Sequence, residues 1–164
     1  TPPGVDGFVA DGQGDWTEMG VEPLTELQFS PVCSPTLLQQ GLREPGDLAR
    51  FPLLHLLDEN DWVRWLAAAR VTGVDARRGI AFSDMNLTLS AAIAGQGIAM
   101  GDTLISRNTL SSGALVQPFS EITIPAPGAY YIVADPTTVE GPLAQAFLGW
   151  LHGQLSATGI TPPR

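Results

Sequence analysis

The sequence predicts a mixed α/β fold with a partly parallel sheet. Short apolar runs bounded by Gly, Pro and Asp alternate along the chain with segments in which apolar residues recur at helical spacing. This alternation is typical of a sheet with helices on its faces. Apolar residues make up 44% of the 164 residues and charged residues 15%. The composition therefore indicates one folded domain or two small lobes rather than a disordered chain.

The first third of the chain reads as two strands followed by a helical turn. The apolar run over residues 5–10 predicts a buried strand that ends in the glycine-rich segment DGQGDW. Alternation over residues 24–34 predicts a second strand. Ser34 then precedes Pro35, which indicates a helical turn capped by the Ser34 hydroxyl.

A brief helix, a strand and an amphipathic helix follow. The segment REPGDLARFP predicts the brief helix, and residues 52–57 the strand. Trp62, Trp65 and Leu66 then recur at helical spacing, with Asn60 or Asp61 as the expected N-cap. Further strands are expected in GIAFSD, GALVQPFS and GAYYIVAD, and a last helix in GPLAQAFLGWLHGQL.

The stretch FSDMNLTLSAAIAGQGIAMG predicts the end of a strand, a short helix, a glycine turn and another strand. A phosphate-binding glycine loop precedes its helix, because the unpaired amides at a helix N-terminus bind the anion. Gly95 and Gly97 instead follow the helix. We therefore interpret Gly95 as a helix C-cap and Gly97 as part of the turn into the next strand.

The other end of this helix is the better candidate for a ligand site. Ser83, Asp84, Met85 and Asn86 stand where a strand passes into the helix, at the carboxyl edge of the expected sheet. Open α/β sheets bind their ligands at this edge. Two interpretations stay open: Asp84 only caps the helix, or the amides of Met85 and Asn86 receive a small polar or anionic ligand.

Charge argues against nucleic-acid binding by these residues. The net charge is −9, all eight basic residues are Arg, and the densest basic cluster is the pair Arg77 and Arg78. Phosphate backbones demand a much denser cationic surface. No apolar run long enough for a membrane span and no signal peptide is visible, so we expect a cytoplasmic protein without membrane contact.

Catalytic and metal-binding patterns are absent from the sequence. The single cysteine, Cys33, lies in an apolar context and is interpreted as a buried, inert thiol. His55 and His152 lie in unrelated apolar segments and are interpreted as structural histidines with hydrogen-bond partners. No GxSxG elbow is present. We therefore expect neither an enzyme, nor a metal site, nor a cofactor.

Five segments together resemble a known family. They are FSPVCSPTLL, DLARFPLLH, DWVRWLAAA, the stretch from Phe82 to Gly101, and AYYIVAD followed by a terminal helix with FLGWL. In this order they are similar to the effector-binding (substrate-binding) domain of LysR-type transcriptional regulators, in the branch of the glycine cleavage activator and the β-lactamase regulator. The resemblance is collinear from about Val5 to Leu155.

The resemblance implies a two-lobed fold of the type 2 periplasmic-binding-protein class. It places a first-lobe part at about residues 1–30 and 126–164, and the second lobe at about 31–125. The opening strand-helix units of the first lobe and the DNA-binding domain are expected outside these 164 residues. The family binds a small-molecule effector between its lobes, forms homodimers or homotetramers, and contacts DNA only through a separate N-terminal helix-turn-helix domain.

The resemblance also suggests effector-binding residues. Ser83, Asp84, Met85 and Asn86 match the family's second-lobe ligand face, although relatives often have Ser at the positions of Met85 and Asn86. Asp11 and Ser34 match cleft-edge and hinge positions, and Asp11 stands where relatives commonly have Arg. Tyr130 matches a pocket aromatic, but a core aromatic is an equal alternative, because only one of Tyr130 and Tyr131 can face a cleft.

Two other functions remain as alternatives. A solute-binding protein of a transport system uses the same two-lobed fold and differs in what precedes the domain. A hydrolase would need a nucleophile that no motif in this sequence identifies.

Overall fold

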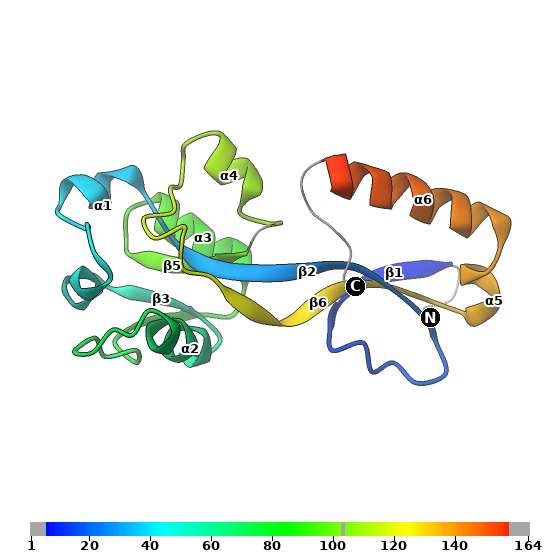
Figure 1. Cartoon of the computed structure of the whole chain (residues 1–164), viewed down its shortest axis with the longest axis horizontal. Helices are drawn as coiled ribbons and strands as arrows, with labels where there is room; N and C mark the ends of the chain where they lie inside the picture. The colour runs from blue at the N-terminus through cyan, green and yellow to red at the C-terminus, as the bar shows by residue number, and fades with distance from the viewer. Residues whose placement is uncertain (1–5, 103, 158–164) are drawn as a thin grey trace. The chain divides into compact units, whose positions relative to one another are not determined.

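The computed structural model describes residues 6–102 and 104–157, and they divide into two compact units (Figure 1). Unit 2 is the continuous segment Gln28–Ile124, and unit 1 combines the residues before and after it. The lobe boundaries expected from the resemblance stay a prediction. The strands and short or long helices follow one another in this order: β1 (Gly7–Gly12), β2 (Gly20–Cys33), α1 (Pro35–Gln39), the 3-10 helix η1 (Pro45–Arg50), β3 (Leu53–Leu56), α2 (Asn60–Ala68), β4 (Gly79–Phe82), α3 (Met85–Ile93), β5 (Ile98–Asp102), α4 (Arg107–Ser111), β6 (Ile124–Ala134), α5 (Pro136–Val139) and α6 (Pro142–Ala157).

The strands form a mixed sheet in the order β1-β6-β2-β5-β3-β4. In unit 2, β3 runs parallel to both β4 and β5, whereas β5 pairs with β2 in the antiparallel direction. In unit 1, β1 and β6 are antiparallel. The prediction of an α/β fold with a partly parallel sheet is confirmed.

The core of unit 2 lies against its parallel strands. Val32, Leu54 and Ala99 have no exposed surface and pack with Leu89 and Ala92 of α3. In Figure 1, α2 lies on the other side of β3 from α3. Helices on both faces are what a parallel sheet requires, because its strands are apolar on both sides.

Two tryptophans anchor α2. Trp62 and Trp65 are buried, and their rings meet edge to face at 6.2 Å. The Trp62 indole N–H donates to the Leu54 carbonyl at 3.1 Å, and that of Trp65 to the Ile122 carbonyl at 2.9 Å. The tryptophans whose spacing predicted α2 therefore bury their rings, and both of their indole N–H groups have hydrogen-bond acceptors.

Four local expectations were wrong in detail. The α2 N-cap is Glu59, one residue earlier than expected. The Asp58 carboxylate accepts a hydrogen bond from the Asn60 amide at 2.9 Å, and Asn60 is already the first residue of the helix. The Ser34 hydroxyl lies 3.0 Å from the Thr36 hydroxyl and caps no amide. The strand β1 reaches Gly12 and is only half-buried, and Val5 lies outside the described residues.

The fourth difference concerns residues 113–120, which form no strand. Only Val116 pairs, in an isolated bridge with Cys33. Leu115 and Phe119 are buried from this segment, so its apolar residues serve the core without a ladder. Pro118 removes one amide that a ladder would need. The short helices α4 and α5 were not predicted.

Cys33 confirms the expectation of a buried, inert thiol. It has no exposed surface, and burial raises the pKa of its thiol to about 11. Within residues 6–102 and 104–157, no group of His, Cys, Asp and Glu side chains is arranged to hold a metal ion. None of the helices in this part of the chain has the length and apolar character that a membrane span requires.

The two histidines differ from the expectation. His152 lies with its Nε2 atom 3.4 Å from Glu22 Oε1. His55 in β3 is only 5% exposed, and neither of its ring nitrogens makes a hydrogen bond to the described residues. The ring nitrogens of His152 also lack a hydrogen bond to the described residues, so the interpretation of both as structural histidines with hydrogen-bond partners was wrong.

We predict that His55 makes the fold less stable in mild acid. Burial lowers the pKa of His55, and the Glu59 carboxylate opposes this shift only in part. The unfolded chain then binds a proton more readily than the folded one, so the free energy of unfolding should fall as the pH drops below about 6.5. Urea unfolding, followed by tryptophan fluorescence between about pH 7.5 and 5.5, measures the free energy of unfolding. This pH range lies above the usual pKa values of carboxylates.

The matched variants are His55→Leu and His152→Gln. His55→Leu should flatten the pH dependence in this window, whereas His152→Gln should retain it. An unchanged slope in His55→Leu would contradict the assignment.

Candidate functional site

The junction between β4 and α3 is built around the Asp84 side chain. Asp84 has extended backbone angles, and its Oδ1 atom accepts from the Asn86 amide at 2.7 Å and the Leu87 amide at 3.2 Å. The Thr88 hydroxyl donates to the Asp84 carbonyl at 2.9 Å. Asp84 is therefore the N-cap of α3, as one of the two open interpretations held.

This cap changes which groups are available to a ligand. The Asn86 amide, expected to receive a ligand, already donates to Asp84. The carboxylate does not bind the Met85 amide. Both cap bonds end on Oδ1, so Asp84 Oδ2 keeps acceptor capacity, and the side chains of Ser83 and Asn86 are exposed beside it. The junction thus offers side chains rather than a row of unpaired amides.

Met85 contributes to the core instead. It is half-buried and packs against the cluster of Val32, Leu54 and Leu115. Ile105, from the turn that follows β5, packs against the same cluster. The Met85 side chain therefore holds the beginning of α3 against the sheet.

The structure separates Ser34 from this junction. Ser34 follows Cys33, which pairs with Ile98 at the beginning of β5, and Ile98 in turn pairs with Leu53 at the beginning of β3. The helix α3 begins where β4 ends, about 10 Å further along the strands. Thr36 lies near Gly95 at the opposite end of α3. Ser34 is buried and bonded to Thr36, so the structure does not bring it together with Ser83 to Asn86.

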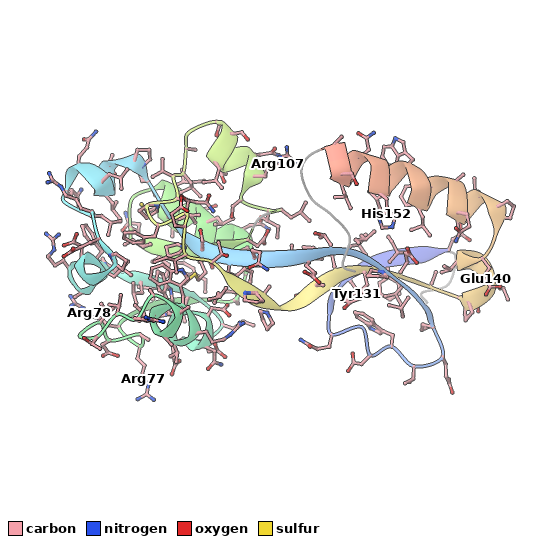
Figure 2. All side chains as sticks on the ribbon, viewed as in Figure 1. Arg77, Arg78, Arg107, Tyr131, Glu140 and His152 are labelled. Atoms are coloured by element: carbon pink, nitrogen blue, oxygen red, sulfur yellow. The ribbon has the colours of Figure 1, made fainter. Side chains whose placement is uncertain are left out.

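In unit 1 the structure brings Asp11 and Tyr130 together. They are directly paired residues of β1 and β6, and such pairs point to the same face of a sheet. Tyr131 faces the other way and packs edge to face on Trp16 of the β1-β2 loop at 5.5 Å. Figure 2 shows Tyr131 on the side of this loop. Tyr130 is half-buried and Asp11 is exposed.

Sequence reasoning missed that all three parallel strands of unit 2 end in the same way. Asp58 follows β3, Asp84 follows β4, and Asp102 ends β5. Each carboxylate accepts amides of the next turn, with Asp102 only 3% exposed and bonded to the Leu104 and Ile105 amides at 2.7 and 2.6 Å. An Asp within two residues of the end of a short apolar run was the signal for this pattern.

Arg107 is a second residue that the sequence did not single out. It begins α4, five residues after Asp102 (Figure 2). Its Nη1 atom is buried and has no hydrogen-bond partner among the described residues. A buried guanidinium nitrogen without a partner is costly, which marks this group as a candidate for binding an acceptor.

Comparisons with known proteins identify the domain. Residues 3–156 match the model of the LysR substrate binding domain. This chain belongs to the LysR substrate-binding domain family. It is 32% identical over 155 residues to the glycine cleavage system transcriptional activator of Escherichia coli K12, covering 93% of this chain and 50% of that protein. The transcriptional activator AmpR of Citrobacter freundii is 33% identical over 154 residues, covering 93% of this chain and 52% of that protein.

Solved structures agree with this assignment. The AmpR effector-binding domain of Citrobacter freundii superimposes with a TM-score of 0.80 at 31% identity, over 94% of this chain and 76% of that one. The effector domain of AmpR from Pseudomonas aeruginosa gives a TM-score of 0.79 at 26% identity, over 94% and 74%. The expected type 2 periplasmic-binding-protein-like fold and LysR effector-binding domain are confirmed.

The LysR relatives are transcriptional regulators and not enzymes, in agreement with the sequence prediction. The chain spans about half the length of these two relatives. The effector-binding residues of this LysR domain stay predictions. Ser34 lies at the opposite edge of the strands from Ser83 to Asn86, and the half-buried Met85 packs against the core of unit 2.

We predict that the Asp84 cap stabilises the LysR domain by about 1 kcal/mol. Asp84→Ala removes both amide acceptors and should lower the free energy of unfolding by about that amount, whereas Asp84→Asn should retain most of it because an amide oxygen still caps. Urea unfolding measures both.

Glu121→Ala is the matched control, because it removes an exposed carboxylate of unit 2 that caps no helix. It should change the stability by no more than about 0.5 kcal/mol. Equal losses in Asp84→Ala and Asp84→Asn would contradict the capping role.

Proposed function

We propose that this chain is the ligand-sensing regulatory domain of a bacterial LysR-type transcriptional regulator. It binds a small metabolite with residues from both units and thereby controls the arrangement of a homodimer or homotetramer. DNA is bound by a separate N-terminal helix-turn-helix domain of the same regulator, and the protein acts in the cytoplasm. The observation that carries the proposal is the Asp84-capped beginning of α3, where Ser83 and Asn86 lie exposed at the carboxyl edge of β4.

The chemistry of unit 2 suggests which metabolites fit. Ser83, Asn86 and Asp84 Oδ2 supply donors and acceptors for a polar ligand, and Asp58 and Asp102 make the surrounding edge acidic. Such an edge disfavours a purely anionic ligand. Arg107 Nη1, which lacks a partner among residues 6–102 and 104–157, suits one carboxylate. We therefore propose a small polar molecule that combines a hydrogen-bond donor or cationic group with a carboxylate.

Unit 1 supplies the second set of contacts in this proposal. Asp11 and Tyr130 share one face of the β1-β6 pair, and a phenol beside a carboxylate offers both ring surface and polar groups. The placement of Tyr131 against Trp16 supports Tyr130 as the tyrosine for ligand contact. Among the predicted residues, Asp11, Ser83, Asp84, Asn86 and Tyr130 are thus retained, and Arg107 is added.

A solute-binding protein of a transport system is the weaker alternative. The relatives that cover almost all of this chain are transcriptional regulators, which favours the sensor role. The sequence that precedes Thr1 in the gene distinguishes the two, because a regulator encodes a helix-turn-helix there and a transport protein an export signal.

We predict that Asn86 contributes to effector affinity. A thermal-shift screen of the full-length regulator against free amino acids and other small molecules that carry both an amino group and a carboxylate identifies a stabilising compound. Isothermal titration calorimetry then gives its Kd. Losing one buried hydrogen bond to the ligand should weaken the affinity of Asn86→Ala about tenfold.

Ser34→Ala is the control variant. It removes a hydroxyl of the same unit that lies at the opposite edge of the strands, so its Kd should change by less than about twofold. If Asn86→Ala binds the compound as tightly as the unaltered protein, Asn86 is not in the site.

A further inference from the structure

One buried polar side chain of unit 2, His55 in β3, has no part in the proposed sensor site. It is 5% exposed, and neither ring nitrogen makes a hydrogen bond to the described residues. Because Leu54 packs under α3, the adjacent His55 points to the opposite face of the sheet, where α2 lies (Figure 1). A Cβ atom at Gly79 would lie 2.8 Å from His55 Nε2 and would overlap the Leu53 carbonyl. Glycine is therefore required at the beginning of β4, whose bare backbone lies against the His55 ring.

A proton on His55 would be a buried charge without a partner. Burial lowers the pKa of His55, and the attraction of Glu59, the Arg78 backbone and Asp58 offsets this only in part. Glu59 is moreover shared with Arg77, whose Nε atom lies 3.3 Å from Glu59 Oε1. The turn after β3 thus holds the ring's nearest carboxylates but leaves it without a bonded one.

The other elements around the ring do not compensate the charge either. The strand β4 has no ionisable residue. The helix α2 buries its two tryptophans and Leu66, while its Asp61 lies 3.5 Å from Arg64. In β5, the Asp102 carboxylate accepts amides of its own following turn. The protonated ring therefore needs water, which only an opening of the structure can supply.

The strand β4 is the weakest cover of His55. It stands at the end of the strand order, next to β3 alone, and three of its four residues are exposed. Phe82 is the β4 residue that packs against the core cluster under α3. Local opening costs least where an element buries little apolar surface, and an edge strand is attached through one ladder. An opening that reaches His55 should therefore begin at β4.

The contacts that hold β4 in place are few. The Leu57 amide donates to the Phe82 carbonyl at 2.8 Å, but Leu57 has a φ of 66°, a region that leucine rarely adopts. Before β4, Arg78 Nη1 donates to the Ala49 carbonyl at 3.0 Å (Figure 2). The Arg77 side chain is 82% exposed, so its ion pair with Glu59 adds little. Opening of β4 would thus release backbone strain and break mainly surface contacts.

We propose that β4 opens from β3 in mild acid when His55 is protonated, and that the Ser83-to-Asn86 junction opens with it. The strand ends at Phe82, directly before Ser83, so a displaced β4 also moves the residues that form the Asp84 cap. The strands β2, β3 and β5 stay paired, because Val32, Leu54 and Ala99 bury their side chains fully between these strands and α3.

The direction of the effect follows from the two proton affinities. In the closed state, burial holds the pKa of His55 below its ordinary value of about 6.5, and in the open state the ring regains that value. The closed state is therefore favoured fully above pH 6.5, and the open population grows as the pH falls below it. Between pH 7.5 and 5.5 this linkage increases the opening equilibrium by up to about tenfold.

One consequence rests on the proposed function. If Ser83 to Asn86 bind the effector, the open state binds it poorly, and the affinity falls in acid. The opening of β4 itself concerns unit 2 alone and is tested without an effector. It can therefore fail or succeed independently of the proposed site.

Hydrogen exchange of the full-length regulator tests this proposal. Peptic peptides are analysed by mass spectrometry at about pH 7.5, 6.5 and 5.5, with labelling times corrected for the intrinsic rate of amide exchange at each pH. A peptide over residues 79–88 reports on β4 and on the amides of Asn86 and Leu87, and one over residues 98–102 reports on β5. Low urea concentrations separate local opening from global unfolding, because the response to urea scales with the surface exposed.

Residues 79–88 should be at least about tenfold less protected than residues 98–102 at each pH, and low urea should change their protection little. Their protection should fall about tenfold from pH 7.5 to 5.5. Equal protection and equal urea dependence in the two segments would mean that His55 acts only through global unfolding. This result overturns the proposal in the unaltered protein, before any variant is made.

The variants His55→Leu and His55→Gln remove the titrating ring, and His152→Gln is the matched control in unit 1. Each His55 variant that keeps a cooperative thermal transition should lose the pH dependence of protection over residues 79–88. The control should retain the tenfold fall. An undiminished fall in a folded His55 variant assigns the acid effect to another group and overturns the proposal as well.

Discussion

The parallel pairing of β3 with β4 and β5 determines where polar groups can gather in unit 2. Parallel strands end at one edge, so the residues that follow them meet there. The pairing is held by apolar residues without exposed surface, Leu54 and Ala99 among them, which pack under α3. Each strand end leaves backbone amides of the next turn without partners, and an Asp satisfies them in all three cases. The acidic edge is therefore a consequence of the topology.

The elements with strong local signals were predictable. The helix α3, its Asp84 cap and its glycine end followed from spacing and residue type, and Gly95 indeed has a φ of 74°. The α2 cap was not predictable, because four consecutive residues in the segment DEND can each accept an amide. Residues 113–120 were misread because the burial of Leu115 and Phe119 mimics a strand pattern while the backbone pairs only at Val116.

The candidate site was predictable only in part. Ser83 to Asn86 were found because a strand-to-helix junction is a local feature. Whether Ser34 lies near them depends on the pairing of Cys33 with Ile98 and of Ile98 with Leu53, which no local pattern contains. The choice between Tyr130 and Tyr131 depended on Trp16, which reaches Tyr131 from a separate loop. Residues that a tertiary contact orients cannot be assigned from sequence spacing alone.

A sensor also needs contacts that differ between its states. A ligand shifts an equilibrium only by the difference between its affinities for the two arrangements, and each tenfold difference corresponds to about 1.4 kcal/mol. A metabolite bound by Ser83, Asp84 and Asn86 alone would touch only unit 2, and the same contacts in every arrangement would leave the equilibrium unchanged. The proposed sensor function therefore requires a second set of contacts to the same ligand, from outside this junction. In the proposed site the Asp84 carboxylate is already held by the Asn86 and Leu87 amides, and a preorganised contact loses no affinity to local rearrangement.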